Sequence, residues 1–224
     1  MNLELLKGRK VIFIIESVSI GGAEKQALIM AEYFSKYHQC KIEIWNFTKG
    51  DHLLLSLVQE KGFTLLLNAF SRVADKHQSW SLQIWGEGPQ RQALEQISRD
   101  LNLSERVRLP GFTRRPFEVL SRADLFAMSS LIEGFPNALC EAMACGLPVV
   151  SFNCSSGIRE IIRDGVDGLI VRANDPTALA SALDGLMANE EERRRLAGKA
   201  LEVTERFGLN KTMAKWEQLV LDAG

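Results

Sequence analysis

Apolar and polar positions follow a repeating order along the chain that predicts strands and helices in turn. Residues 10–15 form an apolar run typical of a buried strand, and residues 41–47 alternate apolar and polar side chains as a second strand does. Residues 23–37, between them, carry apolar side chains at helical spacing after the break at Gly21 and Gly22. This order predicts one βαβ unit with a right-handed crossover.

The pattern is interrupted at residues 48–60, where a polar loop precedes the apolar run from Leu53 to Val58. That run fits either a short buried strand or the start of a helix. Beyond it we expect strands at 81–85, 107–109, 125–128, 148–152 and 168–171, and helices at 63–76, 90–102, 116–122, 136–145, 158–164, 176–188, from 190 onward and 209–221. Such alternation predicts an α/β fold built on a Rossmann-like parallel sheet.

The C-terminal part carries two helix-start signals and one amphipathic face. Asp175 before Pro176 is typical of a helix N-cap, and Asn189 three residues before Glu192 is typical of a capping box. The tail helix is expected to bury an apolar face made of Met213, Trp216, Leu219 and Val220.

Composition narrows the class of protein. The 224 residues are 46% hydrophobic and 25% charged with net charge −1, which is typical of a globular chain and gives no reason to expect nucleic-acid binding. The four cysteines have no metal-ligand spacing, so we expect reduced thiols and no metal. The apolar run from Val11 to Ile15 is too short for a signal peptide or a membrane span. We therefore expect a cytoplasmic protein, with peripheral association at the inner membrane face left open.

The segment 133–150 carries the clearest chemistry. Two carboxylates, Glu133 and Glu141, flank a turn that opens a helix, and Pro136 falls where the first helical residue is expected. The N–H groups from Asn137 to Leu139 would then face an anion. The pattern predicts a cradle for a phosphorylated, hydroxyl-rich ligand. The alternative is an ordinary capped helix followed by a strand, which leaves a charged Glu133 at a strand-to-helix turn unexplained.

Residues 59–224 resemble the donor-binding half of a retaining GT-B glycosyltransferase of family four, also called group 1. The landmarks in family order are Glu60–Phe63, Gly86–Pro89, Val107–Phe112, Ala123–Phe126, the pair Glu133 and Glu141, and Ile158–Ile162. Residues 9–47 resemble the first βαβ unit of the family's N-terminal domain, with its Gly-Gly-Ala-Glu loop at 21–24. Each landmark is weak alone, and the ordered set is specific.

This resemblance implies a reaction and its reactants. The family transfers a sugar from a nucleotide diphosphate donor, often UDP-linked, with retention of configuration and without a metal. The donor is a substrate, so no cofactor is implied. The segment 154–160 is similar to members that transfer N-acetylhexosamine or hexose onto polysaccharide or lipid-linked acceptors.

The resemblance also implies a role for each site residue. Lys61 and the helix amides would neutralise the leaving diphosphate, because the chain has no Asp-x-Asp pair for a metal. Glu133 would hold hydroxyls of the donor sugar, and Glu141 the two ribose hydroxyls. Further donor contacts are implied for Asn137 and Ala138 at the diphosphate, Phe135 and Pro136 along the sugar, Gly21 and Gly22 over the phosphates, and Gly86, Leu109 and Pro110 around the base.

The chain departs from the family's pattern in its N-terminal part. Few residues separate the second predicted strand from Lys61, so most of the acceptor-binding domain is missing. The family's usual arginine, five residues before the lysine, is Ser56 here. None of the histidines falls where the family's N-terminal domain commonly offers one near the reacting centre: His38, His52 and His77.

These departures determine the domains that we expect. We expect a partial N-terminal Rossmann-like unit at residues 1–52 and a donor-binding domain at 53–224, the result of a natural or engineered internal deletion. A two-stranded unit buries too little to be stable alone, so it should dock on the larger sheet or on a second copy of the chain.

Three functions compete. The first is a group 1 glycosyltransferase, with turnover by this truncated chain left open, and the second is a non-catalytic donor-binding module. The third is another GT-B enzyme such as a nucleotide-sugar epimerase, which would need a histidine and further acids in the cleft. A nicotinamide-binding Rossmann fold is disfavoured, because Gly86-Glu87-Gly88 lacks the third glycine.

Overall fold

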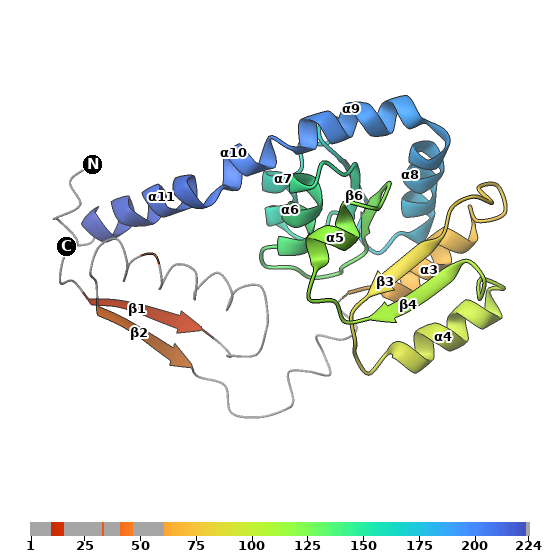
Figure 1. Ribbon diagram of the computed structural model, residues 1–224, viewed down its shortest axis with the longest axis horizontal. Coiled ribbons are helices and arrows are strands. Elements are labelled where there is room, and N and C mark those ends of the chain that lie inside the picture. The colour runs from red at the N-terminus through yellow and green to blue at the C-terminus, as the bar shows by residue number, and fades with distance from the viewer. Residues whose placement is uncertain (1–9, 16–32, 34–40, 47–60, 223–224) are drawn as a thin grey trace. The chain divides into compact units, whose positions relative to one another are not determined.

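The computed structural model describes residues 10–15, 33, 41–46 and 61–222 (Figure 1). These residues divide into two compact units. The larger unit holds residues 61–203. The smaller unit holds residues 10–15, 33, 41–46 and 204–222. In this division the end of the chain groups with the N-terminal residues and not with 53–203.

The smaller unit contains a two-stranded parallel sheet. Strand β1 (Lys10–Ile15) pairs with β2 (Lys41–Asn46), and Lys10 lies opposite Lys41. Both strands predicted from the sequence are confirmed. The predicted helix at 23–37 lies outside the described residues except for Tyr33, which is helical, and the loop of Gly21 and Gly22 lies outside them too.

The C-terminal helix α11 (Leu209–Asp222) belongs to the smaller unit. Met213 is buried as expected, but Trp216 and Leu219 are exposed, so the predicted apolar face is wrong at these two positions. Glu217 is buried in their place, and its Oε1 accepts a hydrogen bond of 2.9 Å from the Tyr33 hydroxyl. A carboxylate with a hydrogen-bond donor can therefore occupy the buried side of this helix.

The larger unit alternates strands and helices, and all of its described strands are parallel (Figure 1). Strand β3 (Leu82–Trp85) pairs with β4 (Val107–Gly111). The strands β5 (Phe126–Met128), β6 (Val149–Phe152) and β7 (Leu169–Val171) form a second sheet in that order. The predicted α/β fold with Rossmann-like parallel strands is confirmed.

Helices connect and cover these strands. Their bounds are α3 (Phe63–Ser71), α4 (Arg91–Asp100), α5 (Pro116–Leu120), α6 (Asn137–Ala144), α7 (Ser156–Ile161), α8 (Pro176–Ala188) and α9 (Glu190–Ala200), with α10 (Val203–Phe207) at the boundary of the two units. The Asp175 carboxylate caps α8 by accepting from the N–H groups of Thr177 and Ala178 at 3.0 and 2.9 Å. Asn189 caps α9 by accepting from Glu192 N–H at 3.0 Å. Both predicted N-caps are confirmed.

The core of the larger unit surrounds strand β6. All four residues of β6 are fully buried, as expected of an inner parallel strand covered on both faces. Phe152 and Val150 share one apolar cluster with Phe70 of α3 and Leu179 of α8. This packing fixes the carboxyl ends of β5 and β6, from which the candidate site is built.

No helix of the part that the structure describes is long and apolar enough to span a bilayer.

Candidate active site

An ion pair joins Lys61 and Glu133. The family resemblance assigned these two residues to different parts of a nucleotide-sugar donor. Lys61 immediately precedes the Gly62 cap of α3, and Glu133 follows β5. Lys61 Nζ lies 2.5 Å from Glu133 Oε1. The Glu133 side chain is only 14% exposed, whereas that of Lys61 is 50% exposed. The carboxylate is therefore held in the protein, while the ammonium group reaches solvent and can contact a ligand.

Two serines hold this pair, and sequence reasoning missed both. Ser130 Oγ donates to Glu133 Oε1 at 2.8 Å, and Ser129 Oγ donates to the backbone carbonyl of Lys61 at 2.9 Å. Both serines are buried, at 2% exposure for Ser129 and 3% for Ser130. The available signal was the change from the apolar strand β5 to two consecutive hydroxyl residues just before Glu133.

Gly62 lets the lysine segment approach β5 closely. Its φ is +60°, in the left-handed region, and a Cβ there would lie 2.0 Å from the Ser129 carbonyl oxygen. Any other residue would clash with backbone as well as strain its own. The contact between the Lys61 segment and the end of β5 therefore depends on glycine at this position.

The start of α6 differs from the sequence prediction. Pro136 is the N-cap residue, with φ −80° and ψ 86°, and not the first helical residue, because its ψ lies outside the helical range. The Asn137 N–H donates to the Phe135 carbonyl at 3.0 Å, and the Leu139 N–H donates to the Pro136 carbonyl at 3.1 Å. Two of the three amides expected to face an anion are therefore already used within the turn.

Ala138 is the remaining amide of that set. Ala138 is exposed, and its N–H has no hydrogen bond to any residue that the structure describes. Phe135 is also exposed, whereas Pro136 is buried and offers little surface to a ligand. Glu141 is partly buried one turn into α6. The pKa of the Cys145 thiol is raised mainly by burial of the thiol and secondly by the negative charge of Glu141.

A third segment, after β6, reaches the same place. The pKa of the Cys154 thiol is raised, mainly by burial and to a smaller extent by the negative charge of Glu133, while the positive charge of Lys61 lowers it. A Cβ on Gly157, in α7, would lie 3.0 Å from the carbonyl oxygen of Gly134. Segments from before α3, after β5 and after β6 thus converge around Glu133, at the carboxyl ends of parallel strands where α/β folds bind ligands.

The residues predicted around the base are held by a separate set of contacts. Gly86 has φ +128°, which favours glycine, and its N–H donates to the Gly111 carbonyl at 2.9 Å. Arg91 Nη2 donates to the Leu109 carbonyl at 2.7 Å, so Arg91 is a further structural residue that the sequence did not indicate. Pro110 is exposed. No hydrogen bond among the described residues links this group to Lys61 or Glu133.

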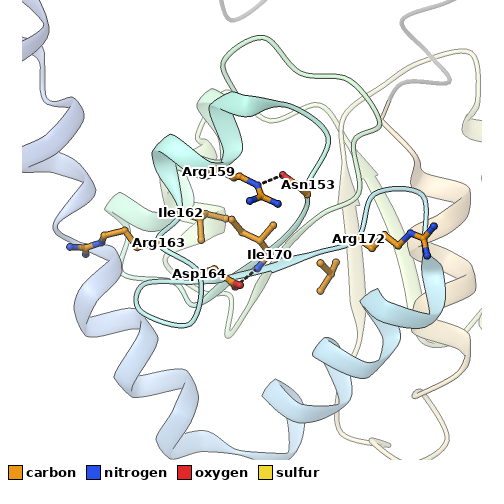
Figure 2. Close-up of a pocket in the computed structure, with 8 residues that line it drawn as sticks. Asn153, Arg159, Ile162, Arg163, Asp164, Ile170 and Arg172 are labelled. Carbon is orange, nitrogen blue, oxygen red and sulfur yellow. Dashed lines mark hydrogen bonds between the residues drawn. The ribbon is translucent and has the colours of Figure 1, made fainter.

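A cavity of about 510 Å³ lies between α7 and β7 and contains none of the predicted site residues (Figure 2). Arg159 Nε donates to Asn153 Oδ1 at 3.1 Å, and the Ile170 N–H donates to Asp164 Oδ1 at 2.8 Å. Arg163 points away from this group (Figure 2). Its guanidinium group instead donates to the carboxylates of Asp167 and Glu202. The cationic groups of the cavity therefore do not converge on one point.

Among the residues described, no three His, Cys, Asp or Glu side chains are grouped so that they could hold a metal ion.

Comparison with known proteins identifies the family. The family described as "Glycosyl transferases group 1" matches residues 52–203, more than half of the chain. The chain therefore belongs to the group 1 glycosyltransferases. The matched region coincides with the larger compact unit.

Individual relatives match over the same part. An exopolysaccharide phosphotransferase of Streptomyces coelicolor is 37% identical over 164 residues, which are 73% of this chain and 17% of that protein. A Campylobacter jejuni enzyme, N-acetylgalactosamine-N,N'-diacetylbacillosaminyl-diphospho-undecaprenol 4-alpha-N-acetylgalactosaminyltransferase, is 32% identical over 153 residues, covering 67% of this chain and 41% of that protein. The chain thus spans less than half the length of either relative.

A solved structure shares the fold. A mutant of the Staphylococcus aureus protein TarM, in complex with fondaparinux, alpha-GlcNAc-glycerol and UDP, aligns with a TM-score of 0.68 at 25% identity. The alignment covers 72% of this chain and 33% of TarM.

Proposed function

We propose that this chain binds a nucleotide-diphosphate sugar, with UDP as the nucleotide, and transfers the sugar with retention to a glycan or lipid-linked acceptor. The observation that carries the proposal is the Lys61–Glu133 ion pair at the carboxyl ends of the parallel strands, within the region matched by the family. A cation and a carboxylate side by side suit a ligand that carries both a diphosphate and sugar hydroxyls.

Each group has a part in this proposal. The half-exposed Lys61 ammonium would pair with the diphosphate and stabilise its negative charge as it leaves the sugar. The Ala138 N–H at the exposed start of α6 would add a backbone donor to a phosphate oxygen. Glu133 would accept hydrogen bonds from the sugar hydroxyls, and Glu141 from the ribose. Because these donors neutralise the leaving group, no metal is required.

The reactants are inferred from relatives. TarM was crystallised with UDP, which supports UDP as the nucleotide here. The Campylobacter jejuni relative is named for a diphospho-undecaprenol-linked acceptor, which supports a lipid-linked acceptor and a place at a membrane surface. We also propose residues 53–224 as the donor-binding domain and residues 1–52 as a partial N-terminal unit.

A second candidate is a donor-binding module without turnover. The observation that favours it is the share of the relatives that this chain spans, 17% and 41%. Such a module would bind the donor at the same residues, without an acceptor site among residues 52–203.

Release of UDP distinguishes the two candidates. The full chain would be incubated with UDP-N-acetylglucosamine or UDP-glucose in EDTA, with and without undecaprenyl-diphosphate-linked sugar in vesicles. Transferase activity predicts acceptor-dependent UDP release, and a product whose new bond keeps the donor's anomeric configuration. A chain that binds UDP but releases none from either donor would support the binding module. A folded chain that neither binds UDP nor releases it would overturn both.

A further inference from the structure

Glu133 Oε1 accepts two hydrogen bonds, from Lys61 Nζ at 2.5 Å and from Ser130 Oγ at 2.8 Å. We propose that Ser130 is a positioning residue, which keeps the Glu133 carboxylate aimed at the donor sugar when Lys61 turns to the diphosphate. This inference rests on the proposed function. It assigns Ser130 to the sugar end of the donor and Ser129 to the phosphate end.

The two donors to Glu133 differ in how easily they can move. Ser130 is 3% exposed and lies two residues after β5. A single rotatable bond joins its hydroxyl-bearing carbon to the backbone, three residues before its partner Glu133. Lys61 is half exposed and has a flexible four-carbon stem. A diphosphate can therefore draw the ammonium group away, whereas the buried hydroxyl has no water to bond with instead.

When Lys61 moves to the diphosphate, Glu133 loses its cationic partner and keeps the hydrogen bond from Ser130. A carboxylate that is 14% exposed and loses its cation needs another donor to stabilise its charge and fix its rotamer. Ser130 continues to bond Oε1. The other oxygen, Oε2, has no hydrogen bond to the residues that the structure describes, so it can accept from a sugar hydroxyl. One oxygen is thus held by the protein and the other is presented to the ligand.

Ser129 provides the matched control. Its hydroxyl bonds the Lys61 carbonyl at 2.9 Å, and its own carbonyl oxygen lies against Gly62. Ser129 therefore supports the backbone of the lysine, and its hydroxyl is directed to that carbonyl and not to Glu133. Loss of this hydroxyl should affect the phosphate end of the donor, which UDP and a UDP-sugar share.

The experiment compares UDP with UDP-N-acetylglucosamine by calorimetric titration of the full chain and its variants. For Ser130→Ala we expect UDP-N-acetylglucosamine affinity to fall about threefold to tenfold, the effect of one hydrogen bond, with UDP affinity unchanged. For Ser129→Ala we expect both ligands to weaken by the same factor. Equal weakening of both ligands in Ser130→Ala would overturn the inference.

A double-mutant cycle separates positioning from a general loss of structure. If Ser130 acts through Glu133, adding Ser130→Ala to Glu133→Gln should cause less than about a twofold further loss of UDP-N-acetylglucosamine affinity. Losses that multiply would overturn the inference. If Glu133→Gln weakens only the UDP-sugar and Ser130→Ala does nothing, the inference alone fails. If Glu133→Gln itself has no selective effect, the proposed sugar role of Glu133 fails first.

Discussion

Lys61 Nζ lies 2.5 Å from Glu133 Oε1, although 72 residues separate them along the chain. The two side chains were predicted to bind different parts of one ligand, the diphosphate and the sugar. Their contact means that the parts of the proposed site are interdependent: a diphosphate that attracts Lys61 also changes the surroundings of Glu133.

Replacement of Lys61 tests the phosphate end of the site. Lys61→Met should weaken UDP and UDP-N-acetylglucosamine equally, by about tenfold or more, because a hydrogen bond to a charged group is lost. Lys76→Met is the matched control, since Lys76 is similarly exposed but pairs with Asp184 at 2.7 Å. Calorimetric titration measures both variants. Equal affinities in Lys61→Met and the wild type would remove Lys61 from the site.

Replacement of Glu141 tests the ribose contact. Glu141→Ala should weaken UDP binding by about 1–3 kcal/mol, the cost of leaving ribose hydroxyls unpaired, and should weaken the UDP-sugar by the same amount. Glu133→Ala should instead weaken the UDP-sugar more than UDP. Glu118→Ala, at an exposed position of α5, is the control and should leave both affinities unchanged. An unchanged UDP affinity in Glu141→Ala would refute the ribose role.

The Cys154 thiol reports on the ion pair without any ligand. Burial and the Glu133 charge raise its pKa above the ordinary value of 9.0, and Lys61 lowers it. Because the thiolate is the reactive form, Glu133→Gln should lower this pKa and speed alkylation by iodoacetamide at about pH 8.5, and Lys61→Met should slow it. Peptide mass spectrometry measures the rates. Cys145, whose pKa is raised by burial and Glu141, serves as the internal control. If the alkylation rate of Cys154 were the same in both variants as in the wild type, Glu133 and Lys61 would not lie close to this thiol.

Asp184 links α8 to the end of the α3 region and should make stability depend on pH. Its carboxylate accepts hydrogen bonds from Lys76 at 2.7 Å and from His77 at 2.6 Å. These bonds lower its pKa below 3.8, and the bond from Lys76 has the larger effect. A carboxyl group whose pKa is lower in the folded state stabilises the fold above its unfolded pKa. That contribution is lost as the pH falls through the folded pKa.

Asp184→Asn should therefore lower the urea midpoint at pH 7, and the difference from the wild type should shrink below about pH 4. Asp75→Asn, at a nearby exposed position, is the control and should behave as the wild type does. A difference that stays constant from about pH 7 to about pH 3 would mean that the effect of Asp184 is not carried by its charge.

The fold could be predicted from the sequence because its signals are local. β1 and β6 each appear as a short apolar run in the sequence, so both were placed within one residue of their observed bounds. The cap of α8 was predictable because Asp175 acts on N–H groups two and three residues away. Burial on α11 was harder, since the choice of Glu217 over Trp216 depends on contacts far along the chain.

The candidate site was predictable by residue type but not by geometry. Lys61 and Glu133 were identified separately, and nothing in the spacing indicated that they contact each other. Ser129 and Ser130 were missed because a serine hydroxyl acquires its meaning from a tertiary partner. The start of α6 was misplaced by one residue because the preference of proline for the first helical turn gave way to the tight bend at Phe135.

The central claim is that this chain binds a nucleotide-sugar donor around Lys61, Glu133 and Glu141. The most direct test is calorimetric titration of the full chain with UDP in EDTA, with GDP and ADP as controls. The account predicts saturable, metal-independent binding of UDP in the micromolar range, with no comparable binding of the other two. A chain shown to be folded by its cooperative urea unfolding, yet unable to bind any of the three nucleotides, would contradict it.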